Sequence, residues 1–465
     1  MSSLLYFNVS NDNNIKFQDD SNFIYDFLNC FCPDIQSRKD FIQYLLSFSS
    51  NKHEAISRQE LLKLFIKEPS LFEKLLIDAK NLILVNNEFL ESNKISKRGI
   101  DSDITSQSYN KLGELSRASL CLKKLLFILK HIRELILEAN CNNSFLNNLI
   151  KELNDIFNKN EYYDLLKILD YLESFRPEDN EFEVLINLND SGKVSISNII
   201  CIDKGKTINR ALPRNYDFTL LLKDSYENLF DIINSYIRAI NFKFSYLYDE
   251  LTFYKVSLRY YGYLNSKGID LTYPKFDNYT KIDNLRDFFL IATNSKVDNI
   301  VPNNFNLIDK NVVLITGDNG TGKTVFMRSI YFALLFGRAG LPIPAETATI
   351  ELYNNIAIKF ADNDTNISSS VGRFEKEVAS ISNIFYNIDD NSVVFFNEIF
   401  QSTSYSEAEY SLSNIVKSFS KRNVKCFLVT HLRELPSYFK IDEADNYLTS
   451  SDDSNRFKLF KNNIV

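Results

Sequence analysis

The octet at residues 317–324, Gly-Asp-Asn-Gly-Thr-Gly-Lys-Thr, constrains the fold more than any other part of the chain. It follows an apolar run at 312–315, which predicts a buried strand, and leads into 325–328, where we expect a helix. A glycine-rich loop in this position turns successive backbone amides toward phosphate oxygens at the positive end of the helix. The octet therefore predicts a phosphate-binding loop, and not a glycine-rich turn that binds nothing.

The octet supplies the residues that we expect to bind a nucleoside triphosphate. They are Gly317, Asp318, Asn319, Gly320, Thr321, Gly322, Lys323 and Thr324. The Lys323 ammonium is expected to reach the β- and γ-phosphates, and the Thr324 hydroxyl is expected to ligate Mg²⁺.

Two further apolar runs end in polar residues that suit phosphate chemistry. The run at 392–396 leads into Asn397 and Glu398, and Glu398 is the candidate to orient or activate water near the γ-phosphate. Asn397 occupies the position where an aspartate commonly supports the metal, and its neutral amide brings no negative charge to Mg²⁺. The run at 425–430 ends at His431, which could sense the γ-phosphate through a hydrogen bond. The alternatives are that Glu398 merely ends a strand and that His431 is structural.

Composition indicates a globular chain with room for more than one domain. The 465 residues are 45% apolar, enough for two or three domains. The net charge of −7 argues against attraction of nucleic acid to the whole surface, although a local basic groove is compatible with it. Scattered cysteines, no leader pattern and no apolar run of membrane-spanning length predict a soluble, cytoplasmic protein with reduced thiols and no membrane partner.

Periodicity along the chain predicts a helical part followed by a part in which strands and helices alternate. Apolar residues recur every three or four positions from about 37 to 175, a strand-like run stands at 4–7, and a long helix is expected over 218–264, ending at Lys267-Gly268. The expected domains are an N-terminal segment at 1–36, a helical core and lever domain at 37–270 with a hairpin insertion near 182–215, and a nucleotide-binding domain at 271–465.

Five motifs stand in a fixed order around the octet. They are Val-Pro-Asn-Asn at 301–304, the octet with its flanks at 316–328, Leu-Pro-Ile-Pro-Ala at 341–345, Asn-Glu-Ile-Phe-Gln-Ser-Thr-Ser at 397–404 and Thr-His-Leu-Arg-Glu-Leu at 430–435. In content and order they resemble the MutS family of DNA mismatch-repair ATPases. The resemblance extends over 245–440, and residues 250–274 are similar to the end of the family's lever helix.

The resemblance implies an α + α/β protein, with a helical core and lever domain followed by an ABC-type P-loop NTPase domain that has a mostly parallel sheet. It implies ATP and Mg²⁺ as cofactors, slow ATP hydrolysis, DNA as a partner, a homodimer formed through the ATPase domain, and a role in mismatch repair or related DNA maintenance. The alternative is a nucleotide-gated clamp or assembly protein with little ATP turnover. An ABC-like ATPase with another partner is disfavoured by the motif order around Pro302 and His431.

Several positions depart from the family pattern. Gly372 stands where the family's signature serine is expected, with serines at 368–370 close by, and Phe400 and Gln401 replace small and basic residues. About 300 residues precede the octet, too few for the family's N-terminal mismatch-reading domain, and we interpret Phe-Leu-Glu at 89–91 as a chance match to the reader's tripeptide in a helical stretch. The short remainder after 456–460 predicts a missing or reduced C-terminal dimerisation tail.

Overall fold

The computed structural model describes residues 3–6, 22–98, 104–158, 160–174, 181–188, 194–202, 216–293, 297–361, 373–400, 403–449 and 457–462. The chain forms two compact units, unit 1 with 1–4 and 69–249, and unit 2 with 5–68 and 250–465. Unit 2 thus takes residues from both ends of the chain, whereas the sequence-based domains are consecutive; the boundaries at 36 and 270 stay a prediction. None of the helices in the described ranges is long and apolar enough to cross a membrane.

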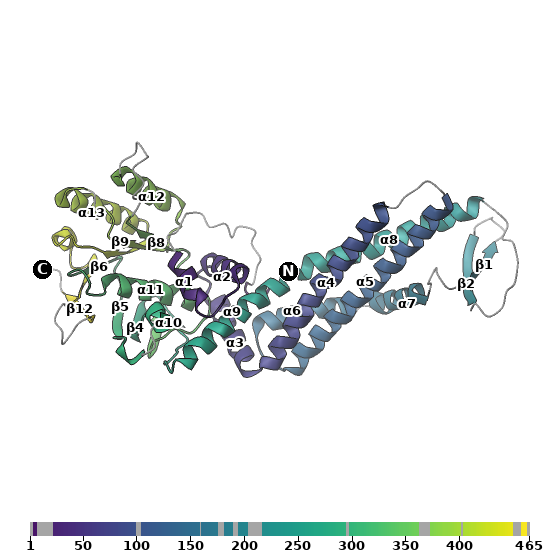
Figure 1. Ribbon diagram of the computed structural model, residues 1–465, viewed down its shortest axis with the longest axis horizontal. Helices are drawn as coiled ribbons and strands as arrows, with labels where there is room; N and C mark the ends of the chain where they lie inside the picture. Colours follow the sequence, from purple (N-terminus) through teal and green to yellow (C-terminus); the bar gives the residue numbers. More distant parts are fainter. Residues whose placement is uncertain are drawn as a thin grey trace. The chain divides into compact units, whose positions relative to one another are not determined.

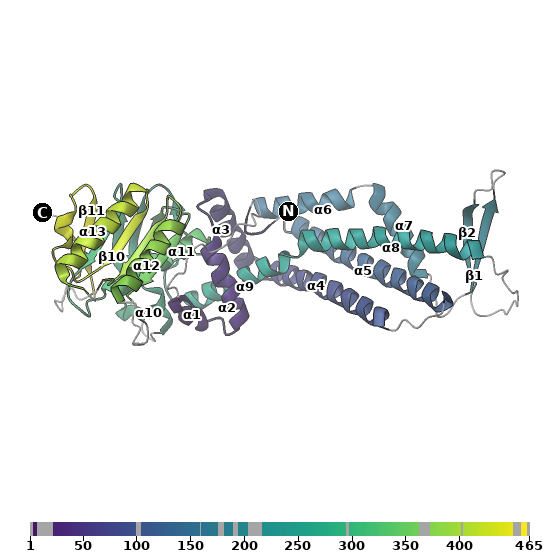
Figure 2. The same ribbon diagram turned by 90° about the horizontal axis from the view of Figure 1, so that it is seen from above.

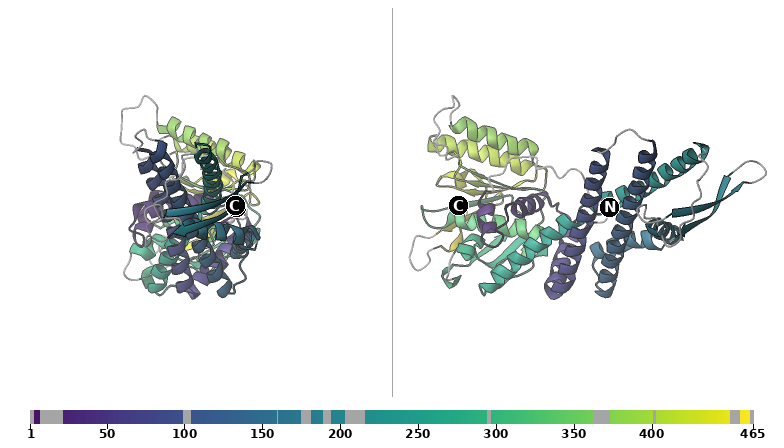
Figure 3. Two further views of the ribbon diagram at one scale, coloured as in Figure 1. Left: turned by 90° about the vertical axis from the view of Figure 1, so that its right-hand side faces the viewer. Right: turned by 45° about the vertical axis from the view of Figure 1, so that its right-hand side comes forward.

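Unit 1 is built from long helices. They are α4 (Pro69–Arg98), α5 (Ile104–Glu138), α6 (Ser144–Phe157), α7 (Asn160–Ser174) and α8 (Tyr216–Phe244). Figure 3 shows the blue helices α4 and α5 side by side. The apolar positions predicted to face a helical core are buried in α5, namely Leu122, Leu125, Leu126, Leu129, Ile132, Leu135 and Ile136. The tripeptide at 89–91 lies within α4.

The predicted hairpin is confirmed, and the predicted long helix is divided in two. Strands β1 (Glu181–Leu188) and β2 (Val194–Ile202) pair antiparallel, and the turn expected at 189–192 lies outside the described residues. The helix expected over 218–264 is wrong as one element, because α8 ends at Phe244 and α9 (Leu247–Ser266) follows. Ser245 and Tyr246 form a turn in the break, and the Ser245 amide still donates to the carbonyl of Asn241 as in a helix. The predicted stop is confirmed, since Gly268 adopts a positive φ of 70°.

The N-terminal part of unit 2 consists of α1 (Asn22–Asn29), α2 (Ile35–Ser47) and α3 (Lys52–Lys67). Asp34 and Asn51 cap α2 and α3 by accepting hydrogen bonds from backbone amides of the first turn. The strand expected at 4–7 is wrong over its described part: 4–6 do not form a strand, and the Leu5 carbonyl accepts a hydrogen bond from Arg58.

Two buried arginines join this N-terminal part to the middle of the chain; we call them the arginine interlock. Arg58 of α3 donates to the carbonyl of Arg338, and Arg338 donates to the carbonyls of Leu45, Tyr353 and Asn354. Both guanidiniums are 1% exposed, and burial lowers the pKa of Arg338 to about 10. Because a buried charge is costly unless it is hydrogen-bonded, these carbonyl acceptors tie α2 and α3 to the rest of unit 2.

The C-terminal part of unit 2 contains two sheets. A six-stranded sheet has the order β12-β11-β6-β10-β9-β8, and its neighbours are parallel except for the edge strand β12. Its strands are β6 (Val312–Thr316), β8 (Ile356–Phe360), β9 (Val393–Asn397), β10 (Lys425–Val429), β11 (Ala444–Thr449) and β12 (Leu459–Asn462). A mixed four-stranded sheet has the order β3-β7-β4-β5, with strands β3 (Lys275–Phe276), β4 (Thr280–Leu285), β5 (Asn303–Leu307) and β7 (Thr347–Ile350).

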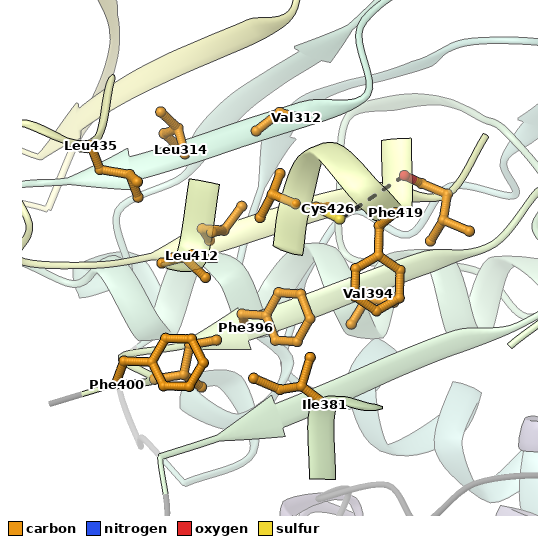
Figure 4. Close-up of a cluster of buried hydrophobic side chains, with 14 of the residues drawn as sticks. Val312, Leu314, Ile381, Val394, Phe396, Phe400, Leu412, Phe419, Cys426 and Leu435 are labelled. Carbon is orange, nitrogen blue, oxygen red and sulfur yellow. Dashed lines mark hydrogen bonds between the residues drawn. The ribbon is translucent and has the colours of Figure 1, made fainter. Parts of the chain in front are cut away.

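Helices cover both faces of the six-stranded sheet. Figure 1 shows α11 (Lys323–Arg338) on one face and both α12 (Arg373–Asn387) and α13 (Tyr405–Lys421) on the other. Figure 2 shows α12 and α13 lying over the strands. Their apolar sides meet the sheet in the cluster of buried side chains drawn in Figure 4. The described chain is therefore mixed helical and α/β, with the fully buried parallel strands that continuous apolar runs predict. The shorter elements of this unit are α10 (Phe288–Thr293) and the 3₁₀ turns Val297–Asn299 and Leu435–Tyr438.

Candidate functional site

The three chain segments singled out from the sequence meet at one edge of the six-stranded sheet. Strand β10 lies between β6 and β9, and Val429 is paired with Ile315 on one side and with Asn397 on the other. The octet follows β6, Glu398 follows β9, and His431 follows β10. Because the three strands are parallel, their carboxyl ends bring these residues together, where open α/β sheets usually bind ligands.

The octet has the backbone of a phosphate cradle. Gly317, Gly320 and Gly322 have φ angles of 140°, 75° and 92°, which side chains with a Cβ rarely adopt. Helix α11 begins at Lys323, and across the described residues its N terminus has no side-chain cap. Amides at such an end are donors for an anion, and the helix dipole favours negative charge there. Asp318, Asn319 and Gly320 are exposed at the tip of the loop.

The Lys323 ammonium group contacts both the backbone of the octet and His431. It donates to the carbonyl oxygens of Gly317 at 2.9 Å and Asp318 at 2.7 Å, and it lies 3.5 Å from His431 Nδ1. Burial lowers the pKa of Lys323, while the nearby carboxylates of Glu398 and Asp318 act in the opposite direction. The three contacts match the three donors of an ammonium group, so Lys323 must exchange one of them to reach a phosphate oxygen.

Thr324 and Asn397 form the candidate metal-binding pair. The Thr324 hydroxyl donates to Asn397 Oδ1 at 3.0 Å, which leaves the lone pairs of the Thr324 oxygen for a cation. Asn397 is 9% exposed and ends β9, so its amide is held by the sheet. Oxygen donors of this kind suit Mg²⁺, and the neighbouring anion cradle suits the phosphates that normally complete its coordination. The residues present therefore fit a Mg²⁺-nucleotide.

Glu398 and His431 face each other across the site. His431 Nε2 lies 2.6 Å from Glu398 Oε1, and both side chains are partly exposed. An ammonium can only donate, so the contact between Lys323 and His431 is a hydrogen bond when Nδ1 is unprotonated, and Nε2 then donates its proton to Glu398. In that tautomer the histidine links the carboxylate to the lysine.

Residues far downstream complete the cradle, and sequence reasoning missed them. The Thr449 hydroxyl lies 2.5 Å from the Thr321 hydroxyl, and a Cβ placed on Gly317 would lie only 2.2 Å from Thr449 Oγ1. The Phe457 ring lies against Gly322, where a Cβ would be 3.3 Å from its nearest carbon. Because Gly317 has no side chain, β11 can lie close to the loop, and Gly317 can also adopt its positive φ angle. No local pattern in the sequence signals these contacts.

Comparison with known proteins places this site in a family. The model of MutS domain V matches residues 313–464, which include the octet, Glu398 and His431. This C-terminal part is therefore similar to MutS domain V. Among the similar proteins are the endonucleases MutS2 of Lactococcus lactis subsp. cremoris (strain MG1363), 33% identical over 129 residues, and of Clostridium novyi (strain NT), 31% identical over 150 residues. The matches cover 28% and 32% of this chain but only 16% and 19% of those relatives.

The matched residues 313–464 include the positions that depart from the family pattern. Gly372, the serines at 368–370 and Gln401 lie outside the described residues. Phe400 is described and is buried, with 2% of its surface exposed, so its side chain belongs to the core under α12. Arg433, two residues after His431, forms an exposed ion pair with Asp318 at the tip of the octet, at a distance of 3.6 Å.

Proposed function

We propose that this chain binds ATP with Mg²⁺ at 317–324, hydrolyses it slowly, and couples its nucleotide state to DNA binding in mismatch repair or a related DNA-maintenance process. One observation carries the proposal: the cradle, Thr324 with Asn397, and Glu398 with His431 meet at the carboxyl ends of neighbouring parallel strands. The similarity of residues 313–464 to MutS domain V supports the same function.

In this proposal the backbone amides of the octet and the Lys323 ammonium bind the phosphates. Thr324 would hold Mg²⁺ through its hydroxyl oxygen, and Asn397 orients that hydroxyl by accepting its proton. Bound Mg²⁺ would neutralise charge on the phosphate oxygens. Asn397 itself adds no negative charge near the metal, so we expect weak metal binding and slow turnover.

Glu398 would orient the attacking water through its carboxylate. His431 donates its Nε2 proton to Glu398 Oε1 and receives a hydrogen bond from Lys323 at Nδ1, so it holds the carboxylate in place. A change in the contacts of Lys323 on nucleotide binding would reach Glu398 through His431, which gives this histidine the role of a sensor.

A phosphate-release assay tests the enzymatic part of the proposal. The purified chain should release phosphate from ATP in a Mg²⁺-dependent manner, and Lys323→Ala should abolish ATP binding or hydrolysis without unfolding the protein. Lys421→Ala, which removes an exposed lysine at the end of α13, is the control and should behave as wild type. Unchanged turnover in a folded Lys323→Ala variant would contradict the assignment of the octet.

A nucleotide-gated clamp with little turnover is the second candidate, and the neutral Asn397 beside Thr324 is the observation that favours it. Such a clamp would bind ATP tightly and change its DNA affinity, but it would release little phosphate with or without duplex DNA. The phosphate-release assay performed with and without duplex DNA, together with a nucleotide-binding measurement, separates the two candidates.

DNA binding and dimerisation are proposed from the family resemblance. Affinity should be measured on homoduplex, mismatched, branched and single-stranded DNA at several salt concentrations, since phosphate contacts make affinity salt-dependent. Light scattering with and without ATP tests for a homodimer formed through the ATPase domain, which includes the matched residues 313–464. The endonuclease activity in the relatives' names is not part of the proposal, because the matched segments cover less than a fifth of those proteins.

A further inference from the structure

The loop that carries Glu398 has an unusual backbone. Glu398 and Phe400 have φ angles of 53° and 64°, in the left-handed region that residues other than glycine rarely occupy. Such a conformation is strained and persists only where the surroundings hold it. The position of the Glu398 carboxylate therefore depends on contacts that hold the backbone on both sides of it.

A hydrogen bond of the backbone lies on each side. The Glu398 amide donates to the carbonyl of Val429 at 2.9 Å, which continues the pairing of β9 with β10 by one residue. Two residues later, the Phe400 amide donates to Glu377 Oε2 at 3.0 Å. Glu377 belongs to α12 and is only 4% exposed, so a carboxylate has been placed in the interior where it accepts a backbone hydrogen bond.

The same face of α12 also holds the Phe400 side chain. Phe374 precedes Glu377 by three residues, so both project from one side of the helix. The rings of Phe374 and Phe400 have centroids 5.1 Å apart. Figure 4 shows the Phe400 side chain at one end of the buried cluster beneath α12 and α13. Helix α12 therefore contacts both the backbone amide and the aromatic ring of Phe400.

We propose that Glu377 is the positioning residue that holds the strained loop at 398–400, and with it the Glu398 carboxylate, in the geometry needed for hydrolysis. The proposal rests on the hydrolytic function proposed above. Loss of the Glu377 carboxylate leaves the Phe400 amide without this acceptor, and the loop can then relax to ordinary φ angles. The backbone hydrogen bond to Val429 and the contact with His431 do not fix the φ angles at 398–400, so the Glu398 carboxylate moves while the octet, on a different strand, stays in place.

Three variants on α12 test this role. Glu377→Ala should lower kcat at least about tenfold, since a misplacement of about 1 Å can cost up to about a hundredfold, and should leave ATP affinity within about twofold of wild type. Glu377→Gln keeps an oxygen acceptor of the same reach and should retain most of the activity. Glu375→Ala removes the same charge from the exposed face of the helix and is the control.

Hydrogen exchange at the Phe400 amide gives a readout that does not depend on turnover. It should be at least about tenfold faster in Glu377→Ala than in wild type and close to wild type in Glu377→Gln, because only the alanine removes the acceptor. Unchanged kcat or unchanged exchange in Glu377→Ala overturns the proposal, as does an equal loss of ATP affinity and kcat. A wild-type chain that binds ATP but never hydrolyses it contradicts the proposed enzymatic function instead, and the exchange rates then decide alone whether Glu377 holds the loop.

Discussion

Asn397→Asp tests the most unusual position of the site. Thr324 Oγ1 lies 3.0 Å from Asn397 Oδ1, and Mg²⁺ binds oxygen at about 2.1 Å, so a cation on Thr324 lies within about 5 Å of the substituted side chain. Attraction between a carboxylate and a dication at about 5 Å is worth about 1.7 kcal/mol with full screening by water, and more when screening is weaker. That energy corresponds to a decrease of roughly 15-fold in the Mg²⁺ concentration that half-saturates the ATPase.

The assay is a titration of ATPase rate against Mg²⁺ for wild type and Asn397→Asp at fixed ATP. We expect the midpoint for the variant to shift to lower Mg²⁺ and its maximal rate to rise. Without Mg²⁺, the new carboxylate should repel the nucleotide and weaken its binding, because Asn397 is 9% exposed and poorly hydrated. A lower Mg²⁺ midpoint, combined with weaker nucleotide binding in the absence of Mg²⁺, distinguishes this effect from a general change in stability.

Asn446→Asp is the matched control. Asn446 is another buried asparagine of the same sheet, and it accepts a hydrogen bond from Thr316 instead of Thr324. It should lower stability without shifting the Mg²⁺ midpoint. Coincident Mg²⁺ curves for wild type and Asn397→Asp would refute the reasoning, because Asn397 would then not lie beside the metal. A slower variant with a shifted midpoint would favour the nucleotide-gated clamp.

Two further predictions concern the catalytic loop and the cradle. Glu398→Gln keeps the size of the side chain but removes its charge, so it should retain ATP, lose turnover and stabilise a dimer in light scattering; wild-type turnover would exclude Glu398 from positioning water. Gly317→Ala should lower the thermal midpoint and ATP affinity more than Gly320→Ala, because its methyl would meet Thr449 Oγ1 whereas nothing lies within 4 Å of a methyl on Gly320. Both glycines have a positive φ, 140° at Gly317 and 75° at Gly320, so both substitutions also carry a backbone cost; equal effects would show that the contact with Thr449 is unimportant.

The parts of the fold that local patterns encode were predicted well. The apolar runs before the octet, before Glu398 and before His431 are the parallel strands β6, β9 and β10. The helical spacing in α5 and the two strands of the hairpin were also correct. Periodicity cannot show which distant segments pack together, so the association of 22–68 with the C-terminal part of the chain was missed.

The same limit applies to the site. The spacing of the octet predicted a strand, a loop and a helix, and the positive φ angles of Gly317, Gly320 and Gly322 agree with it. Thr449 reaches Thr321 across 128 residues, and Glu377 reaches Phe400 from a different helix, so neither contact leaves a trace in the local sequence. The binding and catalytic roles assigned to the site residues stay predictions until the experiments above are done.

The arginine interlock sets an order on the synthesis of unit 2. The Arg58 guanidinium and its acceptor on Arg338 are separated by 280 residues. At about 5–20 residues per second, α3 leaves the ribosome roughly 15–60 seconds before that acceptor is made. Helices α2 and α3 must therefore wait, with their apolar faces uncovered, while all of 69–249 is synthesised and can fold. Chaperones that bind exposed apolar helices would find their main opportunity during this interval, and a nascent chain stalled before Arg338 should be a substrate for them.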